Sequence, residues 1–79
     1  MAVGAYVLVN TNAGKATAAL AAVKRIKGVK QAHLVTGLHD LVAYLEAPTL
    51  KDLGSAVVSK LQKATGVNKT VTCIVVNKG

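Results

Sequence analysis

The sequence has little of what would stabilise a small domain through covalent bonds or metal ions. Its 79 residues include one cysteine, Cys73, one proline, and no tryptophan or phenylalanine. A single thiol excludes an intrachain disulfide and a multi-cysteine metal site, and the two histidines lack metal-ligand spacing, so we expect no metal. A domain of this size buries only about 60% of the surface that its unfolded chain exposes. Association with other subunits is the expected further source of stability.

Acidic residues are also scarce, since three aspartates and glutamates face ten lysines and arginines, which gives a net charge of +7. This charge attracts polyanions in general. The basic residues are scattered along the chain instead of clustered, and a solvated surface explains that pattern better than a nucleic-acid footprint does. We therefore expect no direct specific binding to nucleic acid, and weak binding through the basic surface stays an alternative.

Targeting signals and the usual catalytic motifs are missing as well. The first fourteen residues carry no charge, but they lack the basic start of a signal peptide, and Lys15 ends the run before it could span a bilayer. The lone cysteine fits a reducing cytosol. No GxSxG, CxxC or phosphate-cradling glycine loop occurs. We expect a single cytoplasmic domain over 1–79 with no membrane contact, no cofactor and no catalytic residue.

What the sequence does have is a regular succession of apolar segments separated by turn residues. Valine-rich runs of strand length alternate with stretches whose apolar residues recur at helical spacing. Asn12 and Thr49 stand where helix N-caps are expected, and Gly28 and Gly66 where helices end. The expected elements are a strand over 2–10, a helix over 15–27, strands over 29–36 and 41–47, a helix between Thr49 and Gly66, and a strand over 67–76.

This βαββαβ order predicts the ferredoxin-like fold of the α+β class, a four-stranded antiparallel sheet with both helices on one face. An internal repeat at an offset of 38 residues supports two similar halves: Ala5-Tyr6 recurs as Ala43-Tyr44, and Gly28-Val29 recurs as Gly66-Val67. Strict alternation in strand 29–36 places Val29 with Gln31 and His33 on one face, and Ala32 with Leu34 on the other. All four strands then carry apolar residues on both faces, so a second copy of the sheet is expected to cover the bare face in a homodimer.

The turn between strands 29–36 and 41–47 collects polar residues on an otherwise apolar chain. Glu46 ends a strand and Asp52 fits a helix cap, so only Asp40 lacks an obvious structural role. A glycine turn offers backbone N–H groups to a carboxylate, an aspartate pairs with an ammonium, and threonine hydroxyls suit either end, so a zwitterion is the natural ligand. The alternative is that Gly37 only forms a turn and that the threonines are ordinary strand residues. The candidate residues are Thr36, Gly37, His39, Asp40, Thr70 and Thr72.

Other readings of the polar and aromatic residues are possible. His39 beside Asp40 could form a general base with its orienting carboxylate, but adjacent turn residues usually point in different directions. A small dimeric α/β-barrel enzyme with His33 or His39 as its base stays an alternative. Tyr6 and Tyr44 fall where RNA-recognition domains place stacking aromatics, yet the flanking residues lack that motif. We interpret them as core or subunit-interface residues.

The order of four motifs resembles a known family. These motifs are Ala-Tyr-Val-Leu-Val in the first strand, Lys-Gly-Val after the first helix, Val-Thr-Gly-x-x-Asp at the turn and Gly-Val-x-x-Thr-x-Thr at the last strand. The chain resembles the ligand-binding (RAM) domain of the Lrp/AsnC transcriptional regulators. The resemblance implies α/β-barrel dimers that assemble into rings such as octamers or decamers, with amino-acid effectors bound at dimer–dimer interfaces. The matched effector-contacting positions are Thr36, Gly37, His39, Asp40, Thr70 and Thr72.

Two features depart from the usual pattern of that family. Its members carry an N-terminal helix-turn-helix, which residues 1–79 lack, so the resemblance implies a stand-alone module that acts by mixing with full-length regulators. The family also commonly has an aromatic residue directly before the turn aspartate, where this chain has His39. An ionisable side chain there would alter effector choice or make binding depend on pH.

Overall fold

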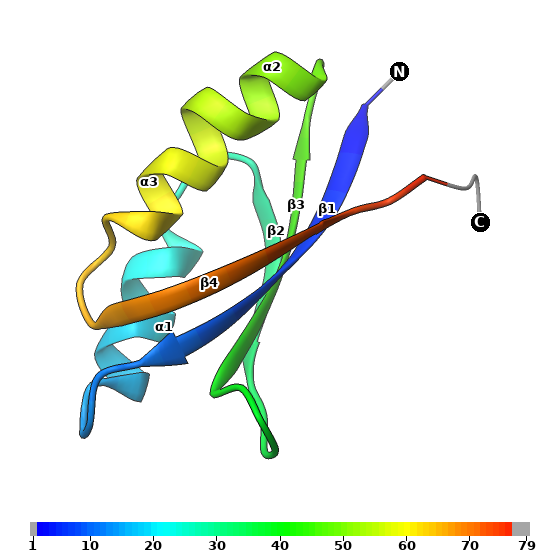
Figure 1. The fold of residues 1–79 in the computed structure, drawn as a ribbon. Helices are drawn as coiled ribbons and strands as arrows, with labels where there is room; N and C mark the ends of the chain where they lie inside the picture. Colours follow the sequence, from blue (N-terminus) through cyan, green and yellow to red (C-terminus); the bar gives the residue numbers. More distant parts are fainter. Residues whose placement is uncertain (1, 77–79) are drawn as a thin grey trace.

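The computed structural model describes residues 2–76, and it contains the six expected segments in the expected order (Figure 1). The second helical segment is one continuous helix with a π-helical middle, labelled in three parts. The elements are β1 (Val3–Thr11), α1 (Ala16–Lys24), β2 (Val29–Leu34), β3 (Leu41–Ala47), α2 (Leu50–Asp52), η1 (Leu53–Val58), α3 (Ser59–Gln62) and β4 (Val67–Ile74).

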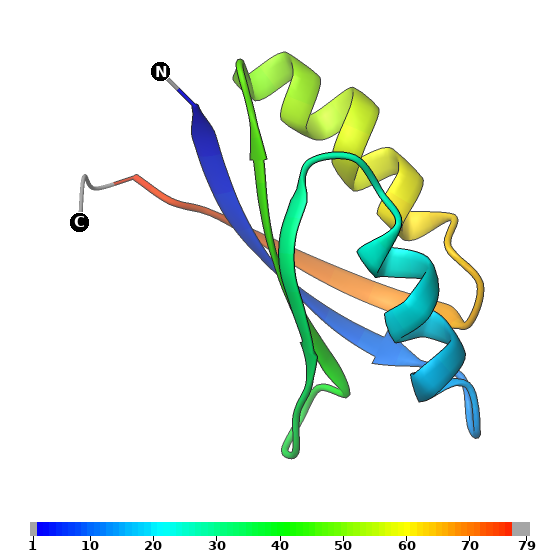
Figure 2. The ribbon, with the colours of Figure 1, turned by 180° about the vertical axis from the view of Figure 1, so that it is seen from behind.

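The strands form one antiparallel sheet in the order β2-β3-β1-β4. Both helices cover the same face of this sheet, and the other face is bare, as the two opposite views show (Figures 1 and 2). The predicted fold class is therefore confirmed: a ferredoxin-like βαββαβ domain of the α+β class. Tyr6 and Tyr44, which the internal repeat relates, are directly paired between β1 and β3.

The hydrophobic core lies between the helices and the covered sheet face. Because side chains alternate along a strand, every second residue of β1 and β3 points into it. The largest fully buried side chains are Val7, Val9, Val23, Leu41, Leu45, Leu53 and Leu61. Among the described residues, no helix is both long enough and apolar enough to cross a membrane.

Of the two helix N-caps that the sequence predicts, Thr49 is found in the structure and Asn12 is not. The hydroxyl of Thr49 accepts a hydrogen bond from the backbone N–H of Asp52 at 3.1 Å, which confirms this N-cap. Asn12 is not a cap, because α1 begins three residues later than a cap there requires, with Lys15 in the cap position. Instead, the Asn12 carbonyl accepts a bond from the Lys15 N–H within the preceding turn.

The apolar stripe of the second helix is also shorter than predicted. Leu53, Val57 and Leu61 are buried as the stripe predicts, but Leu50 is 60% exposed. Leu50 is the first residue of the helix, and the turn that joins it to Leu53 is ordinary α-helix, with the Leu53 N–H bonded to the Thr49 carbonyl. The sheet is contacted by η1 and α3, so Leu50 is exposed because it lies at the helix end and not because the period changes.

A β-bulge changes the faces of β2 from those that strict alternation predicted. Val29 pairs with Leu45, but Gln31 already pairs with Tyr44, so Lys30 is an extra residue. Val29 therefore packs against the core together with the buried Ala32, and the prediction that the two lie on opposite faces is wrong.

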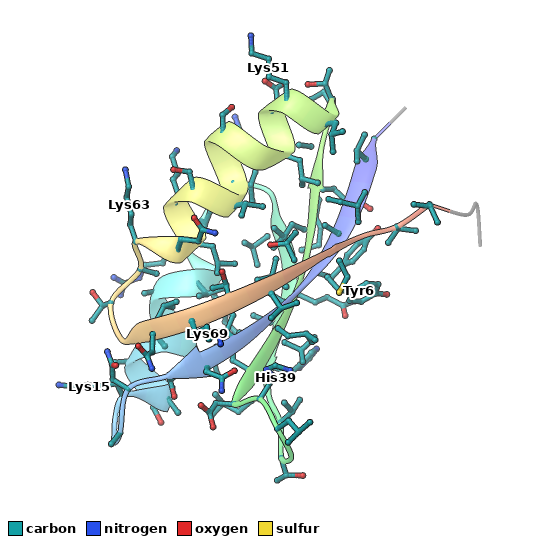
Figure 3. All side chains as sticks on the ribbon, in the orientation of Figure 1. Tyr6, Lys15, His39, Lys51, Lys63 and Lys69 are labelled. Carbon is teal, nitrogen blue, oxygen red and sulfur yellow. The ribbon has the colours of Figure 1, made fainter. Side chains whose placement is uncertain are left out.

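The bare face of the sheet is consequently polar at β2, where Gln31 and His33 lie, and apolar along the middle of the other three strands. The apolar side chains are Tyr6 and Leu8 of β1, Val42 and Tyr44 of β3, and Val71 and Cys73 of β4. We call these six residues the open apolar face. The tyrosine rings lie 4.9 Å apart at 48°, and Tyr6 is 49% exposed and points away from the helices (Figure 3). The tyrosines are therefore not core residues.

Candidate functional site

The hairpin between β2 and β3 projects beyond the end of the sheet (Figure 1). At its base the backbone N–H of Val35 donates to the Asp40 carbonyl at 3.0 Å. At its tip Gly37 has a φ of +120°, which glycine adopts without strain, and Leu38 is 91% exposed. Within residues 2–76, the backbone N–H groups of residues 36–39 donate no hydrogen bond. The tip therefore presents unused donors to solvent.

Asp40 fastens this hairpin to the end of β1. One carboxylate oxygen, Oδ2, accepts hydrogen bonds from the Thr11 backbone N–H at 2.8 Å and from the Thr11 hydroxyl at 3.2 Å. The Asp40 N–H donates to the Val9 carbonyl. These bonds lie where the pairing of β1 shifts register between Asn10 and Thr11. Asp40, for which the sequence offered no obvious structural role, therefore has one in the fold. Its other oxygen makes no hydrogen bond to the described residues.

The His39 side chain contacts Asn10, whereas the neighbouring Asp40 side chain contacts Thr11. Nδ1 of His39 lies 2.7 Å from the amide oxygen of Asn10, and the Asn10 amide nitrogen donates to the Leu38 carbonyl at 3.3 Å. No hydrogen bond within the described chain joins His39 to Asp40, so the two do not form a base with its orienting carboxylate. His33, the other candidate base, is exposed opposite Val42 on the bare face.

Thr70 and Thr72 lie on the far side of β1 from the hairpin. They pair with Val9 and Val7, so they belong to the helix-covered side of the edge strand β4. The Thr70 hydroxyl accepts a long hydrogen bond of 3.4 Å from the Gln62 amide. Within one chain, the structure brings together the four hairpin residues, but no hydrogen bond among the described residues joins these to the two threonines.

An open depression of about 530 Å³ runs beside the hairpin, along Leu34, Val35 and Thr36. Leu34 and Val35 are 44% and 39% exposed, so this part of the hairpin presents apolar surface next to the unused backbone donors. The three lining residues are consecutive in the chain, and the depression is open to solvent.

A separate polar pair lies on the bare face of the sheet. The Tyr44 hydroxyl donates to the Glu46 carboxylate at 3.1 Å, and this hydrogen bond to the negative charge of Glu46 is the main reason that the pKa of Tyr44 is raised. Among residues 2–76, no three histidine, cysteine or carboxylate side chains gather as a metal site would require.

The labelled lysines do not form one basic surface. Lys15 precedes α1, Lys51 lies in α2, Lys63 follows α3 and Lys69 belongs to β4, and their side chains project in different directions (Figure 3). These four are part of the ten basic residues of the chain, of which Lys27, Lys30 and Lys60 line a common depression.

Two residues of the site, Asn10 and Thr11, were not predicted from the sequence. Both are polar and end an otherwise apolar strand, which is the only signal that marks them. Their partners lie 29 residues away in the chain, so the contacts follow from strand pairing and not from any local motif.

Comparison with known proteins identifies the domain. The family model described as the Lrp/AsnC ligand binding domain matches residues 4–78. The uncharacterised HTH-type transcriptional regulator PH1916 of Pyrococcus horikoshii is 38% identical over 52 residues, which are 66% of this chain and 35% of that protein. The matched part of the chain thus spans about a third of the length of its curated relatives.

Solved structures agree with this assignment over nearly the whole chain. Hypothetical protein PHS023 from Pyrococcus horikoshii has a TM-score of 0.85 and 33% identity, over 96% of this chain and 92% of that one. The regulator NMB0573 of Neisseria meningitidis, solved as a complex with L-Met, shares the fold with a TM-score of 0.81 at 19% identity, over 96% of this chain and 51% of that one. The chain therefore belongs to the Lrp/AsnC ligand-binding domain family.

Proposed function

We propose that this domain binds an amino-acid effector at the β2–β3 hairpin and acts through the assembly state that the effector favours. The observation that carries the proposal is the hairpin tip, whose backbone N–H groups at residues 36–39 are unused while its base is fixed by Asp40. The family is defined by ligand binding, and a regulator of the same fold has been solved with L-Met.

The chemistry of the tip suits the carboxylate end of an amino acid. Consecutive backbone N–H groups in a glycine turn make a concave donor set that attracts anions. The Asp40 oxygen that Thr11 does not use carries the charge that an α-ammonium group requires. The apolar surface of Leu34 and Val35 is available to the side chain of the ligand.

The remaining contacts would come from another subunit. Thr70 and Thr72 lie across β1 from the hairpin of their own chain, so their hydroxyls complete a site only where a neighbouring molecule brings them in. The depression along Leu34, Val35 and Thr36 is also open to solvent. Both features support an effector site between dimers.

The dimer itself would form through the open apolar face. A sheet that leaves six apolar side chains on one side gains most by packing against an identical sheet, which is the usual two-fold solution. Dimers would then assemble into a ring such as an octamer or decamer, and full-length regulators of the family would be able to join it. An amino acid that contacts two dimers favours the assembled state by its differential affinity.

The test is a panel of the twenty amino acids, scored by melting temperature and by sedimentation velocity. Asp40→Asn is the informative variant, because its amide oxygen still accepts from Thr11 while the charge is lost. Asp52→Asn removes the same charge from an exposed position and is the matched control. At least one amino acid should shift both observables for the wild type and for Asp52→Asn, and the shift should be lost in Asp40→Asn. No response to any of the twenty would overturn the proposal.

A further inference from the structure

Asn10 contacts two groups of the hairpin, one through its amide nitrogen and the other through its amide oxygen. A carbonyl oxygen only accepts hydrogen bonds, so the Leu38 carbonyl at 3.3 Å must face the Asn10 NH2 group. This orientation turns the Asn10 amide oxygen toward His39 Nδ1 at 2.7 Å. Because that oxygen is also only an acceptor, Nδ1 of His39 must carry a proton.

The consequence concerns the other ring nitrogen. In a neutral imidazole only one nitrogen carries hydrogen, so a protonated Nδ1 leaves Nε2 as a hydrogen-bond acceptor. Nε2 makes no hydrogen bond to the described residues. His39 is half-buried, and its ring is held beside the hairpin tip with the unused Nε2 lone pair as its remaining polar group.

We propose that Asn10 is a positioning residue that fixes His39 as the Nδ1–H tautomer, so that Nε2 accepts from the ammonium group of the effector and releases it when His39 is protonated. The proposal rests on the proposed effector site. It also narrows the class of ligand to amino acids that have a free ammonium group. N-acetylated analogues lack the positive charge and the extra N–H donors that Nε2 of His39 and the Asp40 carboxylate would recognise.

Protonation of His39 converts its Nε2 atom from a hydrogen-bond acceptor into a donor. The imidazolium has a donor at Nε2 and a positive charge, both of which oppose an ammonium. The charged and titratable groups around it are Asp40 in the same hairpin, Lys69, which pairs with Asn10 from β4, and His33 of β2 on the same sheet face. Val9, Asn10 and Thr11, the β1 residues that the hairpin contacts, are uncharged.

The tautomer is measured first, in the protein without ligand, from the 15N chemical shifts of its histidine rings. His39 should be the Nδ1–H tautomer, whereas His33, which has no such partner among the described residues, serves as the internal reference. Asn10→Leu should abolish this tautomer preference, and Asn10→Asp, which keeps an acceptor, should retain it. An Nε2–H tautomer of His39 in the wild type would overturn the proposal whether or not any amino acid binds.

The second measurement is the pH dependence of binding for an amino acid that scores in the panel, by calorimetry between about pH 5 and 8. As the pH falls, the dissociation constant should rise, by at most roughly tenfold per pH unit because binding excludes one proton. His39→Phe should flatten the profile and His33→Gln should leave it unchanged. Asn10→Asp should move the loss of binding to higher pH, because its charge favours the imidazolium. Binding that is flat across this range in the wild type would refute the proposed switch while leaving the effector site itself intact.

Discussion

Replacing Asp40 by alanine should destabilise the domain even when no ligand is present. The substitution removes two hydrogen bonds to Thr11, at 2.8 and 3.2 Å, and leaves a part-buried backbone N–H without its acceptor. Hydrogen bonds to a charged group contribute roughly 1.5–3 kcal/mol each, and partial exposure places the sum near the lower end, at about 2–3 kcal/mol. For a domain of this size, that corresponds to a fall in Tm of about 10–20 °C.

Two variants separate the parts of this effect. Thr11→Val removes only the hydroxyl bond and should cost about 1 kcal/mol, and Asp40→Asn keeps an acceptor for the backbone N–H and should also cost about 1 kcal/mol. Urea denaturation without amino acids measures all three, at one protein concentration so that the proposed subunit association contributes equally to each. If Asp40→Ala unfolds within about 0.5 kcal/mol of the wild type, which is the range of neutral surface substitutions, the fastening role of Asp40 is refuted.

Three other substitutions test separate parts of the structure. Gly28→Ala should destabilise by more than about 1 kcal/mol in urea denaturation, since φ is +102° and a Cβ would lie 2.8 Å from Val57 Cγ2; equal stability would contradict the close approach. Val71→Lys places a charge on the open apolar face and should convert dimers to monomers in sedimentation experiments, whereas an unchanged mass would argue against that interface. Glu46→Gln should lower the pKa of Tyr44 in an ultraviolet titration, because the raised pKa depends on this carboxylate, and the stability that the pair contributes should be lost only as the pH rises above about 10.

Much of the fold was predictable because its determinants are local. The alternation of apolar residues, the cap at Thr49 and the left-handed glycines at 28 and 66 each act within a few residues of sequence, and all are found in the structure. Their carbonyls are used alike in the two halves: Gly28 accepts from the Glu46 N–H and Gly66 accepts from the Asn12 N–H. The internal repeat thus reflects a repeated way of joining a helix end to the sheet.

One error occurs where one residue alters a local period. The extra residue Lys30 shifts Val29 onto the same face as Ala32, and no composition rule marks a bulge at that position. Leu50 fits the helical period but lies at the helix end, before the η1 and α3 segments that contact the sheet. In both cases long-range pairing and packing decide the outcome, and these are absent from a sequence window.

The sequence proposes residues for the candidate site, but it does not reveal their contacts. Glycine and aspartate in the turn indicate a ligand-binding hairpin, yet the sequence left Asp40 without a structural role because its partner, Thr11, comes from β1. The Asn10 contact that holds His39 is equally remote in sequence. Strand pairing creates both contacts, so they become visible only once the register of β1 and β3 is known.

The most direct test of the effector site is hydrogen–deuterium exchange, measured with and without a saturating amino acid from the panel. The backbone N–H groups of residues 36–39 have no acceptor among the described residues, so they should exchange rapidly in the free protein. A bound carboxylate should slow their exchange, and exchange across residues 69–73 of β4 should slow with it when a neighbouring dimer supplies Thr70 and Thr72. Binding that leaves residues 36–39 unprotected and slows exchange elsewhere would contradict the account.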